Sequence, residues 1–131
     1  MKLNSVVLTG TTNGSGAATI TSTNAHTGFL HSVQWIDGDL ADGVDGVFSV
    51  TAASGAGGVA QTLLTLTDAN IDLWYYPRMV VHDNTGTEVT YDATNQLYGP
   101  KAIINGILTL VIASGGDTKT GGAIVYYIPA E

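Results

Sequence analysis

The feature that most constrains this chain is a series of short runs rich in Val, Ile, Leu and Thr, separated by clusters of Gly, Asn, Asp and Ser. The runs recur roughly every ten residues, a spacing typical of antiparallel sandwiches and barrels. The clearest cover residues 3–9, 18–23, 29–36, 47–51, 62–67, 73–76, 79–82, 88–91, 107–113 and 123–128. Strands at this density leave no room for helices longer than a turn or two.

Alternation of apolar and polar side chains inside the runs supports strands. Phe29, Val33 and Trp35 fall on one face of their run, whereas Ser32 and Gln34 fall on the other. We therefore predict an all-β fold, a single antiparallel β-sandwich domain over residues 1–131. Residues 1–10 are either a strand of that sandwich or an N-terminal arm that reaches a neighbour.

Composition excludes several classes of protein. The chain is 44% hydrophobic and only 11% charged, whereas disordered chains combine low hydrophobicity with high charge. It has no Cys, which excludes disulfides and thiolate sites. Its net charge of -7 argues against nucleic-acid binding. Its longest apolar stretch, 102–113, is interrupted by Asn105, Gly106 and Thr109, so we expect no membrane partner.

The segment 37–46 is the part of the chain whose composition is most typical of a ligand-binding site. It brings four carboxylates onto a glycine-rich loop, and such oxygen-rich loops bind calcium. The carboxylates are Asp37, Asp39, Asp42 and Asp45. Their spacing does not match an EF-hand, so a solvated acidic loop is the favoured interpretation and a weak calcium site is the alternative. We expect no other metal and no cofactor.

The segment Trp74-Tyr75-Tyr76-Pro77-Arg78 is dense in aromatic residues and holds the only Arg of the chain. Trp, Tyr and Arg are favoured at protein interfaces, and aromatic rings also stack on sugars. The alternative is that part of the set simply packs into the core. We expect Arg78 to have a carboxylate partner, within the molecule or across an interface.

Catalytic signatures are missing from the sequence. The three histidines, His26, His31 and His82, are scattered, and no Gly-x-Ser-x-Gly elbow accompanies His82-Asp83. The loop 115–122 has two glycines at Walker spacing without the Lys and Ser/Thr that must follow them. We therefore predict that the protein is not an enzyme.

Several segments resemble a family of small proteins encoded with the head genes of tailed phages. They are 41–45, 63–68, Tyr75-Tyr76-Pro77-Arg78 with Val81-His82-Asp83, and the closing segment 112–121. Members of that family look like capsid decoration (cement) proteins or other minor virion proteins. The resemblance implies a jelly-roll-like sandwich that binds the major capsid protein as a homotrimer, is made in the host cytoplasm and ends on the virion surface.

Two other functions remain open from the sequence. One is a glycan-binding surface module that uses Trp74, Tyr75 and Tyr76 as stacking platforms and the acidic loop for calcium. The other is a head–tail connector or tail component. In each case the low charge suits contacts between subunits, because few charged groups must lose water when an interface forms.

Overall fold

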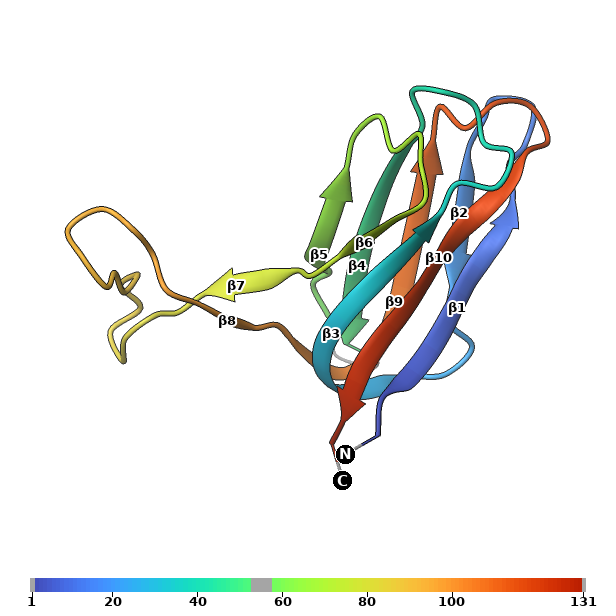
Figure 1. Ribbon diagram of the computed structural model, residues 1–131. Coiled ribbons are helices and arrows are strands. Elements are labelled where there is room, and N and C mark those ends of the chain that lie inside the picture. The colour runs from blue at the N-terminus through green and yellow to red at the C-terminus, as the bar shows by residue number, and fades with distance from the viewer. Residues whose placement is uncertain (1, 53–57, 131) are drawn as a thin grey trace.

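The computed structural model describes residues 2–52 and 58–130, which contain ten strands and no helix (Figure 1). The strands are β1 (Asn4–Thr11), β2 (Ala18–Thr21), β3 (His26–Ile36), β4 (Asp45–Ala52), β5 (Gln61–Leu66), β6 (Leu73–Tyr75), β7 (Arg78–Val80), β8 (Tyr98–Pro100), β9 (Ala102–Ala113) and β10 (Thr120–Pro129). The predicted all-β class is confirmed.

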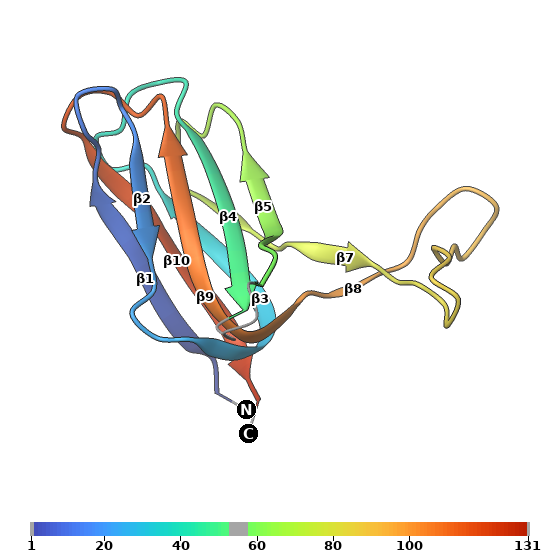
Figure 2. The ribbon, with the colours of Figure 1, turned by 180° about the vertical axis from the view of Figure 1, so that it is seen from behind.

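Eight of these strands form two packed antiparallel layers (Figures 1 and 2). In one layer β10 lies between β1 and β3, and β6 pairs with the other edge of β3. In the second layer β9 lies between β2 and β4, and β5 forms the edge beside β4. The start of β3 also pairs with the start of β9, which links the layers. The predicted antiparallel sandwich is confirmed, while its jelly-roll form stays a prediction.

The core lies between the two layers and follows from period-two alternation. Leu8, Ala123 and Trp35 are neighbours across β1, β10 and β3, and all three are fully buried. From the second layer Phe48 and Leu110 point toward them. The remaining buried apolar members of this core are Val6, Leu30, Val33, Leu40, Val44, Val50, Leu63, Leu66, Ala69, Ile103, Leu108, Ile112, Val125 and Tyr127.

The N-terminal segment belongs to the sandwich. Residues 4–11 form β1, which pairs with β10 from Asn4↔Tyr127 to Thr11↔Thr120. Residues 4–11 are therefore an edge strand of the sandwich rather than an arm.

The chain departs from the expected strands between Pro77 and Lys101. After Pro77, β7 and β8 pair with each other and project from the sandwich (Figure 1). The expected strand at 88–91 makes only two isolated bridges, His82↔Glu88 and Thr90↔Gln96. We call this projection, residues 78–100, the arm.

Candidate interaction surfaces

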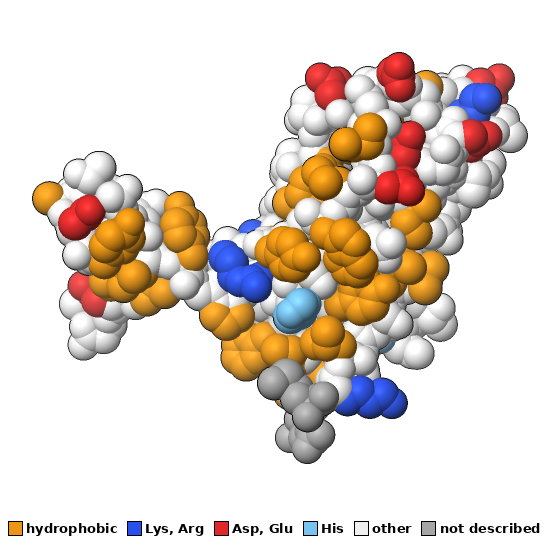
Figure 3. All heavy atoms as spheres, viewed as in Figure 1, with side chains coloured by type: hydrophobic (Ala, Val, Ile, Leu, Met, Phe, Trp, Pro, Cys, Tyr) orange, Lys and Arg blue, Asp and Glu red, His pale blue; other side chains and the backbone are white. Residues whose placement is uncertain are grey.

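One outer face of the sandwich carries a group of apolar side chains, here called the aromatic face: the exposed Val7, Phe29, Trp74 and Tyr76 and the half-buried Tyr126. Phe29, Trp74 and Tyr76 are respectively 50%, 46% and 59% exposed. We expected Phe29 on the face of Val33 and Trp35, but the register shift opposite Tyr126 and Tyr127 turns it outward. Trp74 and Tyr126 lie side by side, with ring centroids 5.4 Å apart. Figure 3 shows this apolar patch beside a histidine and basic side chains. An exposed apolar patch of this kind is typical of a surface that contacts another protein.

Strand pairing explains why only part of the aromatic segment faces outward. Tyr75 pairs with the buried Val33 and packs against the core, whereas Trp74 pairs with Gln34, whose side chain lies on the outer face. Tyr76 follows on the same side as Trp74, and its ring meets that of His31 edge to face. Of the predicted interface residues, Trp74, Tyr76 and Arg78 are therefore exposed, whereas Tyr75 is half-buried.

Arg78 lies beside the aromatic face at the root of the arm. Its guanidinium donates hydrogen bonds to the carbonyl oxygens of His31, at 3.1 Å, and Pro77, at 2.8 Å. Within the described chain these bonds go to carbonyl groups and not to the carboxylate that we expected. The Arg78 side chain is exposed, so the expected carboxylate partner across an interface stays a prediction.

The arm is held together by backbone and turn hydrogen bonds rather than by a core. None of the residues 78–100 is buried. The amide of Val81 donates to the carbonyl of Leu97, that of Leu97 to Val89, and that of Val89 back to Val81, so a closed ring of hydrogen bonds joins three segments. Its exposed apolar side chains include Tyr91 and Tyr98, 66% and 62% exposed. A ribbon of this size is marginal in water without a covering surface.

Two carboxylates shape the turns at the tip of the arm. Asp83 accepts hydrogen bonds from the hydroxyl and amide of Thr85, which lower its pKa. Asp92 accepts from the amides of Asn95 and Thr94, and these bonds lower its pKa in the same way. Both groups therefore serve as turn residues that stay ionised. Asp83 is directed to its own turn and does not orient His82 as a base.

The acidic loop, residues 37–46, lies at the end of the sandwich away from the two ends of the chain (Figure 1). Its carboxylates accept hydrogen bonds from neighbouring loops and strands. Asp39 accepts a hydrogen bond from the amide of Thr120, and Asp45 accepts one from the amide of Asp68. Nowhere in residues 2–52 and 58–130 do three or more His, Asp or Glu side chains form a group that could hold a metal ion. The four-carboxylate calcium site is therefore not assembled in this structure.

Asp37 is the carboxyl of this loop whose charged form is destabilised by its surroundings. Its Oδ1 atom is buried without a hydrogen-bond partner. Burial raises the pKa of Asp37, and repulsion from Asp72, Asp42 and Asp39 raises it further. The folded state therefore holds the Asp37 proton more tightly than the unfolded state does. Folding becomes less favourable as the pH rises from the unfolded pKa through the folded one.

Replacing this carboxyl should stabilise the protein at neutral pH. We expect Asp37→Asn to raise the melting temperature by a few degrees at pH 7, because the cost of ionising Asp37 disappears. Well below its ordinary pKa, at about pH 3, the wild-type carboxyl is already neutral and the gain should vanish. Asp117→Asn, in an adjacent loop, controls for net charge. A gain of equal size at both pH values would contradict this explanation, which melting curves can decide.

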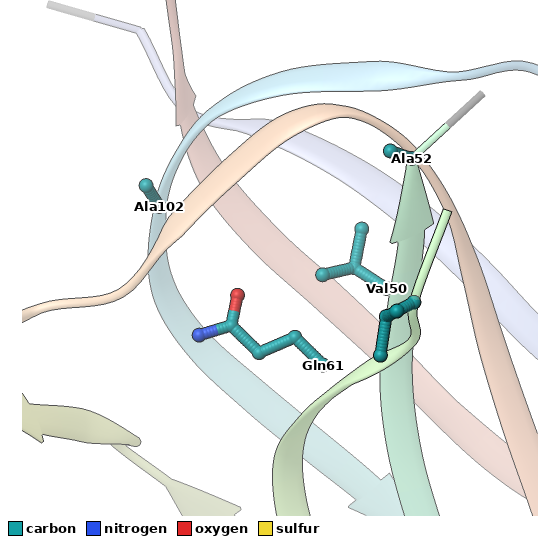
Figure 4. A pocket seen from close by; sticks show the side chains of 5 residues that line it. Val50, Ala52, Gln61 and Ala102 are labelled. Carbon is teal, nitrogen blue, oxygen red and sulfur yellow. The ribbon is translucent and has the colours of Figure 1, made fainter. Parts of the chain in front are cut away.

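A small hollow of about 260 Å³ opens between β4, β5 and the start of β9 (Figure 4). Val50, Ala52, Val59, Gln61 and Ala102 line it, and the Gln61 amide is the one polar side-chain group among them. None of these five side chains is a base, an acid or a nucleophile. The aromatic face and the arm are thus better candidates for function than this hollow.

Comparison with known proteins leaves these surfaces as the basis for any functional conclusion. No family model, curated protein or solved structure matches the chain. In the part of the chain that the structure describes, no helix has the length and hydropathy to cross a membrane. The exposed apolar side chains and the distribution of charge are therefore the features of the molecule that point to a function.

Proposed function

We propose that this chain is a non-enzymatic virion structural protein that decorates a phage capsid. In this role it binds the lattice of the major capsid protein as a homo-oligomer, a trimer in the simplest case, and stabilises the head. The jelly-roll-like form of the sandwich and the resemblance to phage head-encoded proteins belong to the same proposal. Its place is the outer surface of the virion.

The observation that carries the proposal is the combination of the aromatic face with the projecting arm. Exposed Phe29, Trp74 and Tyr76, with the uncovered apolar side chains of the arm, leave two surfaces that gain stability when other subunits cover them. Aromatic side chains are enriched at such interfaces, and uncharged surfaces lose little solvation there. A compact sandwich with these two surfaces suits a protein that acts by packing against a lattice.

The mechanism is linkage between binding and shell stability. A subunit that binds the assembled shell, and not the separated capsid proteins, stabilises the shell by an amount that grows with the ratio of its concentration to Kd. At a hundredfold excess over Kd this amounts to about 2.7 kcal/mol for each site. The acidic charge of the free subunit keeps it soluble before it binds.

The proposal predicts that added protein raises the melting temperature of bare capsid shells. Scanning calorimetry of shells with increasing amounts of the chain should show a rise that saturates when the lattice sites are full. Shells of an unrelated capsid protein serve as the control and should melt unchanged. Equal melting of bare and treated shells would contradict a stabilising role.

The glycan-binding alternative has weaker support. It requires Trp74, Tyr75 and Tyr76 to form one stacking platform, but Tyr75 turns toward the core. Trp74 also already lies against Tyr126, which narrows the ring surface left for a sugar. The capsid decoration function uses the same face without requiring all three rings.

A further inference from the structure

The charges of this molecule are segregated, and this segregation limits what can cover the arm. Every carboxylate in residues 79–100 is at or near its tip, and no Lys or Arg lies between Arg78 and Lys101. The loop end of the sandwich is also acidic (Figure 3) and carries Asp37, Asp39, Asp42, Asp45, Asp68, Asp72 and Asp117. An acidic arm is therefore repelled by that end of any copy of the same protein.

The aromatic face is the surface that complements the arm. Its exposed members carry no negative charge, and Arg78 borders it through its hydrogen bond to His31. Lys101, next to the end of β8, is already engaged, because its Nζ donates to the carbonyl oxygen of Leu63 at 2.6 Å. The arm offers exposed apolar side chains together with Asp83, Glu88 and Asp92. Apolar surface thus meets apolar surface, and the carboxylates meet Arg78.

The arm cannot cover the aromatic face of its own chain in this arrangement. Figures 1 and 2 show β7 and β8 leading the arm away from the sandwich, so that its tip lies far from the layer that carries Trp74. A second copy can supply the missing half of the contact, because every copy carries both an arm and an aromatic face. Reciprocal contacts of this kind close into dimers or small rings.

We infer that the arm of one copy lies on the aromatic face of another copy. The apolar side chains of the arm cover Phe29, Trp74 and Tyr76, and its carboxylates approach Arg78 of the second copy. This contact gives Arg78 the carboxylate partner that it lacks within the described chain. The inference deepens the proposed function and rests on its self-association, since it names the surface through which the copies associate.

The test is the mass of the full chain in solution, without capsid shells. Light scattering coupled to size exclusion should give a mass of at least two subunits for the wild type, each subunit being 13.5 kDa. Trp74→Glu alters the face, and the double substitution Tyr91→Ser and Tyr98→Ser alters the arm. Each should raise the dissociation constant at least about tenfold. Val111→Glu, on the outer face of the other layer and 42% exposed, should leave the mass unchanged.

Mixing the face variant with the arm variant separates arm exchange from other modes of association. The mixture contains an intact arm on one chain and an intact face on the other, so it should form mixed oligomers that neither variant forms alone. A wild type that stays at 13.5 kDa, variants that keep the wild-type mass, or a mixture that stays monomeric would overturn the inference. A monomer that still raised the melting temperature of shells would leave capsid decoration standing and remove only arm exchange.

Discussion

Trp35→Ala is expected to remove a large part of the stability of this protein. The Trp35 side chain is fully buried between the layers, and its indole N–H donates to the carbonyl of Ala69 at 2.8 Å. Its ring also lies against Gly46 of the opposite layer, where an added Cβ would be only 3.2 Å from the indole. Truncating a buried Trp costs about 3–5 kcal/mol, against a total of about 5–15 kcal/mol for a domain of this kind.

The second tryptophan of the chain provides the matched control. Trp74 is 46% exposed on the aromatic face, so Trp74→Ala should cost less than about 1 kcal/mol of folding stability. The loss of folding stability for Trp35→Phe should lie between the losses for Trp35→Ala and Trp74→Ala. This variant keeps a ring in the core but leaves the Ala69 carbonyl without its donor. Urea unfolding followed by circular dichroism measures all three. Equal losses for Trp35→Ala and Trp74→Ala would contradict the placement of the core.

Gly122→Ala is expected to have an effect of similar size for a different reason. Gly122 lies in β10 between β1 and β3, with a φ of +146° that side chains rarely adopt. A Cβ at this position would overlap the carbonyl oxygen of Leu8. Backbone strain and overlap each cost about 1–3 kcal/mol, so we expect a loss of about 2–6 kcal/mol.

Gly86→Ala separates backbone strain from overlap. Gly86 also has a positive φ, +86°, but no atom lies within 4 Å of the added Cβ. It lies in a turn of the arm, outside the core, so its substitution should cost about 1 kcal/mol or less of global stability. The comparison uses the same urea unfolding curves. A Gly122→Ala protein as stable as Gly86→Ala would show that β1 and β10 do not approach as closely as described.

Most of the sandwich could be predicted from the sequence because burial on one face of a strand leaves a period-two pattern. The runs at 29–36 and 123–128 became β3 and β10, two long strands that face the core. The arm could not be predicted in the same way. The segment at 88–91 has the Val and Thr content of a strand, but in the arm it lies against no second layer. β8 contains Gly99 and Pro100, residue types that are depleted in strands, so the sequence pattern does not predict a strand there.

The candidate surface was predicted in part. The alternation of Leu73, Trp74, Tyr75 and Tyr76 shows that Trp74 and Tyr76 share a face, but both faces of this short run are apolar. Only the pairing of Tyr75 with Val33 decides which residues turn inward. The arm gave one sequence signal, a stretch from Met79 to Pro100 with three carboxylates and no Lys or Arg. That asymmetry indicates a segment with a charge preference of its own, and its projection follows only from tertiary structure.

The central claim is that this chain decorates a capsid, and a density map of the virion tests it most directly. Electron cryo-microscopy of particles made by the genome that encodes the chain should show the two-layered sandwich at repeated positions on the outer surface of the head. The proposal predicts clusters of copies in contact with the major capsid protein. A bare head with the sandwich located in the tail, in a ring at the head–tail junction, or absent from the particle would contradict it.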